Sequence, residues 1–450
     1  MIFDFLKYCL DRKDNMSNVV ADIDWQQLYS FASKQAILGL CFDGIERLGK
    51  EYPEELKQNP IGRELLMTWM GKAQQIRRHS VKVNGVAAKL YSKFRKDGLR
   101  CCILKGQGNA LMYPNPYSRT PGDIDVWVNA SREYLTEYAK RHFNLEDDIR
   151  FHHLETTMDG VPVELHFFPC TMNNPIYNAC LQKWFKRNAD LQCSNVVSLP
   201  DGIGEIAIPT TAFNVVYQLT HLYHHFFDEG IGMRQIIDYF LVVNDFSKNV
   251  FLNNDLSNHP VNFSNHPVPL SKEGSTFSPS PSSSGSGNVT APSRCSEPLR
   301  SKDGGPSKVS PDCAGWDRLA IEGDNSATAV TSSASAALVV VQRELKCLGL
   351  WKFARAVMYV LHEALGLSEE KMIAPMDEKR GKLLLAEILN GGNFGKHFTK
   401  YGHFTQQGMA KKYFLKIWRN MHFVRYYPAE ALSEPIFRTW HFFWRLKHRR

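Results

Sequence analysis

Two aspartates, Asp123 and Asp125, stand two positions apart in the segment GDIDVWV. Side chains at positions i and i+2 of a β-strand point to the same face of a sheet, so both carboxylates can serve one metal cluster. Mg²⁺ prefers carboxylate oxygens and keeps waters and substrate phosphates as its other ligands. We expect a two-ion site that clamps the attacking and leaving oxygens of an in-line displacement. An Asp-x-Asp that makes turn hydrogen bonds at a strand end is the alternative.

A third carboxylate, Glu164, lies in the segment VPVELHF, which has the composition of a strand. A neighbouring strand can bring Glu164 beside the aspartate pair. There it would complete one metal site and orient or deprotonate an attacking hydroxyl. His166 alternates with Glu164, so it would either share the active face and line the substrate or pack within the sheet. A solvent-facing place for Glu164 is the alternative.

A glycine segment, Gly106-Gln107-Gly108, follows the apolar run LRCCIL and precedes the aspartates. At a strand-to-helix transition, free backbone N–H groups can receive phosphate oxygens. Lys105 stands just before the glycines, and Arg119 is near enough in sequence to reach a triphosphate. The residues expected to bind the nucleotide are Lys105, Gly106, Gln107 and Arg119. Both cations could instead be ordinary surface charges.

Several strands must position these residues. The run Leu99–Leu104 predicts a buried strand, and Asp123–Val128 alternates polar with apolar residues, as a strand with one buried face does. A helix is expected over Arg132–His142. The segments FHHLETTM and VPVELHF flank Asp159-Gly160, a strong hairpin signal. The pattern predicts an α+β fold with a small mixed sheet, flanking helices and a mostly helical C-terminal part.

Helical spacing dominates the rest of the chain, including Gln74–Arg95 and Thr210–Asp245. After Leu338 two helices are expected, broken near Gly349, and then helices over 376–390, 409–427 and 434–450. Residues from about 250 to 335 are rich in Ser, Pro, Gly, Asn and Thr, and such a stretch cannot bury enough apolar surface to offset its ordering entropy. We divide the chain into an N-terminal helical region (1–95), a core (96–248), a low-complexity disordered insertion (249–336) and a C-terminal helical region (337–450).

The composition is that of a globular protein. Apolar residues make up 43% of the 450 residues and charged residues 22%. No apolar run is long enough to span a bilayer, and the opening MIFDFLKYCLDRKDN predicts an amphipathic helix rather than a secretion signal. Ten cysteines form no CxxC pair, which argues against a zinc ribbon and a disulfide framework. A reducing, cytoplasmic setting is the simplest interpretation.

The positive charge gathers at the C-terminal end. From Lys396 onward, Glu430 and Glu434 are the only acidic residues among many Lys and Arg. Such a tail can make weak contact with an anionic surface or bind nucleic acid. A solvated helical face is the alternative. For Trp440 and Trp444 in this tail, we expect packing onto the preceding helices.

The order of the motifs resembles a known superfamily. A glycine turn, then D-x-D, then a hydrophobic–acid–hydrophobic strand is similar to the signature of the DNA polymerase β-like nucleotidyltransferases. The fuller pattern of LKG, YP, Arg119, GDID and VELH resembles a bacterial branch of uncharacterised nucleotidyltransferases. So does the later TTAFNVVYQLTHLYHHFF…GIGMRQIIDYF, which carries His221, His225, Arg234 and Asp238. The resemblance covers roughly residues 20 to 250.

The resemblance implies roles for particular residues. Asp123, Asp125 and Glu164 become the metal-binding carboxylates, and Gly106 the phosphate-cradling glycine. The superfamily commonly has Gly-Ser at this turn, whereas this chain has Gly106-Gln107. The comparison implies that Lys105 takes the place of the hydroxyl as a point charge. The residues expected to line the substrate are His166, His221, Arg234 and Asp238.

The reaction implied is attack by an acceptor hydroxyl on the α-phosphate of ATP or another nucleoside triphosphate, with two Mg²⁺ ions and release of pyrophosphate. The acceptor stays open among a small molecule, a protein side chain and an RNA end. The competing interpretation is a non-catalytic nucleotide-binding or interaction module. His221, His224 and His225 have spacing suited to metal binding, but we favour a structural or substrate-lining role. The glycines of GGNFGKH do not fit a phosphate-loop motif.

Overall fold

The computed structural model describes residues 1–11, 15–145, 150–255, 333–397 and 409–448. Most of the expected insertion, residues 256–332, therefore lies outside the described residues. Its described ends are helical, because α11 (Met233–Asp255) continues past residue 249 and α12 (Ser333–Cys347) begins before residue 336.

A four-stranded mixed sheet forms the centre of the site region. It consists of β1 (Cys101–Leu104), β2 (Ile124–Val128), β3 (His153–Met158) and β4 (Val161–His166), in the order β1-β2-β4-β3. The β2–β4 pair is parallel, and the β1–β2 and β3–β4 pairs are antiparallel. The expected small mixed sheet and the α+β fold class are confirmed. A separate hairpin is made by β5 (Val196–Ser198) and β6 (Glu205–Ala207).

The turn between β3 and β4 follows from its two residues. Asp159 has φ 51° and Gly160 has φ 72°, so both lie in the left-handed region that a type I′ hairpin turn requires. Asp and Gly adopt this conformation at low cost. The hairpin predicted from Asp159-Gly160 is therefore confirmed, and it fixes the register of β4.

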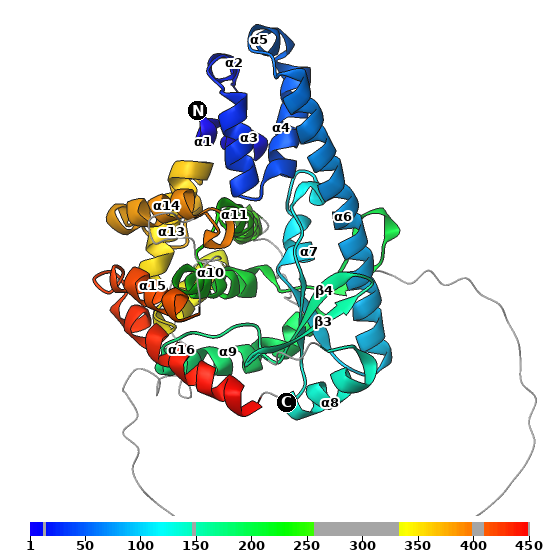
Figure 1. Cartoon of the computed structure of the whole chain (residues 1–450), viewed down its shortest axis with the longest axis vertical. Helices are drawn as coiled ribbons and strands as arrows, with labels where there is room; N and C mark the ends of the chain where they lie inside the picture. The colour runs from blue at the N-terminus through cyan, green and yellow to red at the C-terminus, as the bar shows by residue number, and fades with distance from the viewer. Residues whose placement is uncertain (12–14, 146–149, 256–332, 398–408, 449–450) are drawn as a thin grey trace, which may run out of the picture. The chain divides into compact units, whose positions relative to one another are not determined.

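Both faces of the sheet are covered. Ile103, Val126 and Leu165 join one apolar cluster with residues of α6 (Arg63–Lys96) and α8 (Arg132–His142). Trp127 faces the other layer and stacks on Phe213 of α10 (Thr211–Asp228), with ring centroids 6.0 Å apart. Figure 1 shows α6 and α10 on opposite sides of the sheet. The expectation that β2 would have one buried face is wrong, because all five of its residues are buried.

The remaining elements are helical. Before the sheet come α1 (Ile2–Cys9), α2 (Ser17–Val20), α3 (Trp25–Lys34), α4 (Leu38–Glu51) and α5 (Pro53–Gln58). Between and after the strands lie α7 (Gly106–Ala110), η1 (Pro116–Ser118), α9 (Pro175–Ser194), η2 (Pro200–Gly202), α13 (Trp351–Leu365), η3 (Glu369–Lys371), α14 (Glu378–Gly391), η4 (Asn393–Gly395), α15 (Met409–Met421) and α16 (Pro428–His448). The expected break near Gly349 separates α12 from α13. The last helix begins at Pro428, earlier than expected, and accommodates Pro435.

A close backbone approach joins distant parts of the chain near α11. Gly232 precedes α11, and a Cβ there would lie 2.7 Å from the Cα of Asn393 in η4. Only glycine permits this approach. The side chain of Gln35 accepts a hydrogen bond from the backbone N–H of Met233 and donates one to the carbonyl of Ile388. These contacts hold η4 beside the start of α11.

Several cations of the basic C-terminal end are used in packing. Lys416 and Arg438 bind Asp228 of α10 at 3.0 Å and 2.6 Å. Arg419 is buried and donates to the carbonyl of Phe226 at 2.7 Å. These three side chains therefore attach α15 and α16 to α10 rather than forming a solvated face.

The aromatic side of α16 differs from the expectation as well. Trp440 and Trp444 pack against Phe151, which precedes β3, with ring centroids 5.1 Å and 5.5 Å apart. Both rings therefore contact the segment before β3, which the expectation of packing onto the preceding helices did not include. Within the described residues, no helix combines the length and the apolar character needed to cross a membrane.

Candidate functional site

The register of the parallel strands brings two acidic residues together. Asp125 of β2 pairs with Glu164 of β4, and on its other side Asp125 pairs with Leu104 of β1. Asp123 lies just before β2, two positions from Asp125 and facing the same cavity. The three carboxylates singled out in the sequence therefore gather on or next to the two inner strands of the sheet.

His166 bridges two of these carboxylates. Its Nε2 lies 3.1 Å from Oδ1 of Asp125 and 3.1 Å from Oε2 of Glu164. Ligand atoms of Asp125, Glu164 and His166 all lie within 4.8 Å of one another, so these residues could hold a metal ion. Burial works to lower the pKa of His166, but its bonds to the two carboxylates raise it to about 9.

Lys105 reaches the same carboxylates from the β1–α7 turn. Its Nζ lies 3.0 Å from Oδ1 of Asp125 and 2.8 Å from Nε2 of His221. Lys105 has φ 51° and Gly106 has φ 38°, so the chain turns sharply here. Burial and the nearby ammonium hold the pKa of His221 well below its usual range, so its neutral ring can accept from Lys105. A Cβ on Gly106 would meet nothing within 4 Å, which leaves the turn open for a ligand.

The electrostatics of the two aspartates differ. Burial works to raise the pKa of Asp125, but Lys105 and His166 hold it below its ordinary value. The charge of Asp125, together with burial, raises the pKa of Asp123 to about 6. Negative charge at Asp123 is therefore unfavourable unless a cation is added, which is the behaviour expected of a cation site.

Arg119 and Asp238 form a buried pair instead of a free phosphate-binding group. Nε and an Nη of Arg119 donate to the two carboxylate oxygens of Asp238 at 2.8 Å and 2.7 Å. Tyr113 also donates to Asp238, at 2.8 Å. This network fixes the loop that leads from α7 to β2. Arg119 still lines the cavity, but two of its donors are already occupied.

Three other residues expected at the site, Arg234, His221 and Gln107, differ in whether they line the cavity. Arg234 lines the cavity and donates to the carbonyl of Thr120 at 3.2 Å, and burial and Arg119 lower its pKa. His221 lines the cavity as well. Gln107 is buried beside the cavity and does not line it. Glu164 and His166 do not line the cavity either, although His166 contacts both Asp125 and Glu164. The other expected site residues all line it.

Phe394 is one of the cavity-lining residues that the sequence did not indicate. Phe394 of η4 lines the cavity, with its ring 5.4 Å from that of His225 and 5.5 Å from the guanidinium carbon of Arg234. Phe394 belongs to the segment GGNFGKH, which follows helix α14 and so differs from a phosphate loop, as expected. No local signal could have placed it here, because its position depends on the contact between η4 and α11.

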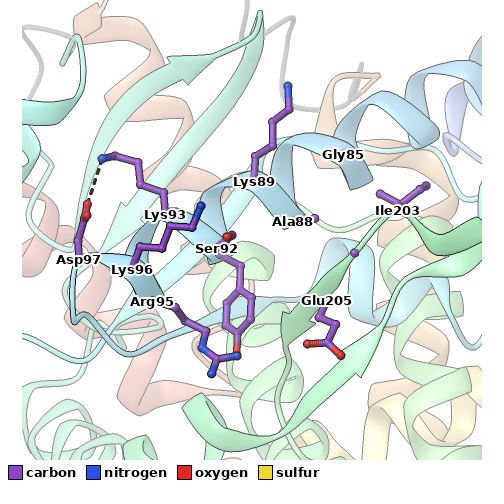
Figure 2. Close-up of a pocket in the computed structure, with 12 residues that line it drawn as sticks. Gly85, Ala88, Lys89, Ser92, Lys93, Arg95, Lys96, Asp97, Ile203 and Glu205 are labelled. Carbon is purple, nitrogen blue, oxygen red and sulfur yellow. Dashed lines mark hydrogen bonds and ion pairs between the residues drawn. The ribbon is translucent and has the colours of Figure 1, made fainter. Parts of the chain in front are cut away.

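The cavity at the carboxylates is small, about 60 Å³. A larger hollow of about 1030 Å³ lies along α6 and is lined by Lys89, Lys93, Arg95, Lys96 and Glu205 (Figure 2). Lys93 pairs there with Asp97 at 3.0 Å. This hollow contains none of the clustered carboxylates, so the smaller cavity is the candidate site.

Comparisons with known proteins assign the chain to a family. A family described as "Uncharacterised nucleotidyltransferase" matches residues 21–257, which is more than half of the chain. No curated protein matches. A solved structure that resembles the chain is an antigenic nucleotidyltransferase-like protein from Paracoccidioides brasiliensis, at 16% identity over 39% of this chain and 86% of that chain, with a TM-score of 0.25.

Proposed function

The chain belongs to this family of uncharacterised nucleotidyltransferases, and we propose that it transfers a nucleoside monophosphate group from a nucleoside triphosphate to an acceptor hydroxyl with the help of Mg²⁺. The reaction would take place at Asp123, Asp125 and Glu164, in the manner of the polymerase β-like superfamily. The register that sets Glu164 beside Asp125 is the single observation that carries the proposal.

The donor set fits Mg²⁺. Asp123, Asp125 and Glu164 offer carboxylate oxygens, which are hard ligands of the kind Mg²⁺ prefers. The raised pKa of Asp123 adds support, because it reflects negative charge that the nearby cations do not fully balance. When bound, Mg²⁺ would neutralise the phosphates and activate the attacking hydroxyl.

The chain's own residues would do the rest. The Gly106 turn and Lys105 would bind the phosphates, since the turn is open and the ammonium lies at its edge. The Arg119–Asp238 pair would keep the loop before Asp123 in place. Glu164 would accept the proton of the acceptor hydroxyl, either directly or through one water. Catalysis would come chiefly from positioning and charge neutralisation.

The size of the cavity sets a condition on nucleotide binding. At about 60 Å³ it is far smaller than the roughly 300 Å³ or more of a pocket that holds a drug-sized ligand. A phosphate tail would fit, but the base and sugar need more room. Phe394 is one of the side chains that line the cavity, so binding of the whole nucleotide would require this lining to move.

A second candidate function is supported by the same geometry. Lys105 and His166 already pair with Asp125, and His166 also pairs with Glu164. Because Lys105 and His166 would themselves neutralise these carboxylates, the arrangement would suit a non-catalytic nucleotide-binding or interaction module that needs no metal. Such a module would bind nucleotide equally well with Mg²⁺ and with a chelator, and would release no pyrophosphate.

The test of the proposed function uses ATP, CTP, GTP and UTP labelled at the α-phosphate, with Mg²⁺ and a cell extract as the source of acceptors. Wild-type protein is compared with the Asp123→Asn/Asp125→Asn double variant and with Asp159→Asn, a change at an exposed turn aspartate. Transfer by wild type and Asp159→Asn but not by the double variant supports the proposal. The labelled product identifies both the base and the acceptor class. Absence of transfer from all four nucleotides would favour the binding module.

A further inference from the structure

Three histidines gather where β3 begins and β4 ends, beside the carboxylates. His153 of β3 pairs directly with His166 of β4, and His152 accepts a backbone hydrogen bond from Phe167 at 2.9 Å. The ring of His153 lies with its centroid 4.3 Å from that of His152 and 5.1 Å from that of His166. The hairpin set by Asp159-Gly160 fixes this pairing, so the cluster is a consequence of the strand register.

The ring nitrogens are close together and incompletely bonded. One nitrogen from each of His152, His153 and His166 lies within 4.8 Å of the other two. His166 is 3% exposed, and its buried Nδ1 has no hydrogen-bond partner. His153 is 4% exposed, and its Nδ1 lies 3.2 Å from Oε2 of Glu164 without forming a hydrogen bond. Within the described part of the chain, the His152 ring makes no hydrogen bond either.

The potential metal ligands of the histidine cluster are imidazole nitrogens, whereas those of the aspartate pair are carboxylate oxygens. Buried polar atoms usually have partners, so several unpaired ring nitrogens at one place indicate a ligand. Imidazole nitrogens favour zinc-like transition metals, whereas carboxylates alone favour Mg²⁺. Three imidazoles and one carboxylate satisfy the four-coordinate preference of Zn²⁺. Glu164 is the available carboxylate, because its Oε2 neighbours both His153 and His166, while Glu155 also pairs with Arg150 at 2.9 Å.

We propose that His152, His153 and His166, with Glu164 as the fourth ligand, bind a divalent transition-metal ion of the zinc class. The site shares Glu164 with the proposed reaction centre but uses neither Asp123 nor Asp125, and metal binding by the three histidines does not depend on the nucleotidyl-transfer reaction. Ligand atoms around Zn²⁺ stand roughly 3.3 to 3.5 Å apart, whereas the three imidazole nitrogens now lie within 4.8 Å of one another. The rings and Glu164 must therefore rotate to close onto an ion. A bound ion ties the ends of β3 and β4 together and fixes Glu164.

A metal-free explanation accounts for only part of these contacts. As counter-ions, His153 would pair with Glu155 and His166 with Asp125 and Glu164, at the 3.1 Å distances observed. This explains one nitrogen of each ring. It explains neither the unpaired Nδ1 of His166 nor the presence of His152 against the other two rings. A metal ion uses all three rings.

The test measures metal binding by the full chain, with Co²⁺ as a spectroscopic substitute for Zn²⁺. Wild-type protein is expected to bind one Co²⁺ with visible absorption bands of a four-coordinate site, to release it to Zn²⁺, and to retain it in excess Mg²⁺. His152→Asn and His153→Asn are expected to weaken Co²⁺ binding at least tenfold. His79→Asn, a change at an exposed histidine of α6, is expected to bind as wild type does.

Two further measurements show whether a loss of Co²⁺ binding comes from unfolding or from the aspartate site. Thermal melts in EDTA check that His152→Asn is folded, and folding is expected because that ring makes no hydrogen bond among the described residues. The Asp123→Asn/Asp125→Asn variant is expected to keep the Co²⁺ spectrum while losing transfer, which separates this site from the proposed reaction. No Co²⁺ spectrum in wild type, equal affinity in His152→Asn, or loss of the spectrum in the aspartate variant would each overturn the proposal.

Discussion

Asp125 and Glu164 are directly paired across the parallel strands β2 and β4, with their carboxylates bridged by His166. The antiparallel partner of Asp125, Leu104, ends β1 and delivers Lys105 to the same carboxylate. The register of β1, β2 and β4 therefore brings two acids, Asp125 and Glu164, together with Lys105 and His166. A shift of one residue in β4 would turn Glu164 to the opposite face.

Glu164→Gln tests the proposed proton acceptor. The amide keeps the shape of the side chain but can neither accept a proton nor supply a second anionic oxygen to a metal ion. We expect the rate of nucleotidyl transfer to fall roughly a hundredfold to a thousandfold. Glu205→Gln, at an exposed residue of β6, serves as the control. Unchanged kcat in Glu164→Gln would remove this residue from the mechanism.

Lys105→Met tests whether the ammonium binds phosphate. Loss of one charged contact is expected to weaken nucleotide binding about tenfold, measured by titration with a fluorescent nucleotide. Lys89→Met, which removes an exposed lysine paired with Asp159, should leave the affinity unchanged. If Lys105 only neutralises Asp125, the thermal stability will change while the nucleotide affinity stays the same.

Asp238→Asn tests the role of Arg119. Arg119 and Asp238 are both buried, so removing one charge leaves the other without its partner. We expect a loss of about 3 to 5 kcal/mol in the free energy of unfolding, measured in urea. Arg119→Lys should also be destabilising, because lysine lacks the two-pronged geometry. A role for Arg119 limited to the triphosphate predicts the opposite, namely weaker nucleotide binding with unchanged stability.

Glu430 of α16 gives a prediction for the dependence of stability on pH. Burial raises its pKa to about 7, against the lowering effect of the Asn173 and Asn174 backbone N–H groups. A folded-state pKa above the unfolded one means that the stabilisation is present at low pH and is lost as pH rises towards 7. Between pH 5 and pH 8, Glu430→Gln should therefore gain roughly 2 kcal/mol in unfolding free energy relative to wild type. Parallel stability curves for the two proteins would contradict the raised pKa.

The sequence predicted the elements whose signals are local. Asp159-Gly160 specified a hairpin because both residues tolerate positive φ, and the alternation in VPVELHF set Glu164 and His166 on one face. The proximity of Glu164 to Asp125 is observed, while the metal-binding role of both stays a prediction. Helix spacing likewise predicted α10 and α11.

Contacts between distant segments could not be predicted in this way. Arg119 looked free in the sequence, but Asp238 on α11 occupies it in a buried pair. Phe394 reaches the cavity because Gly232 allows the backbone of η4 to approach α11. The full burial of β2 also depends on the packing of helices on both faces. A one-dimensional pattern contains none of these relationships.

The most direct measurement of the central claim compares ATP labelled at the α-phosphate with ATP labelled at the γ-phosphate, incubated with the protein, Mg²⁺ and cell extract. Nucleotidyl transfer at Asp123, Asp125 and Glu164 predicts that the α-label enters the acceptor and the γ-label leaves in pyrophosphate. The Asp123→Asn/Asp125→Asn variant should transfer neither. Entry of the γ-label into the acceptor, or α-label transfer that survives the double substitution, would contradict the account.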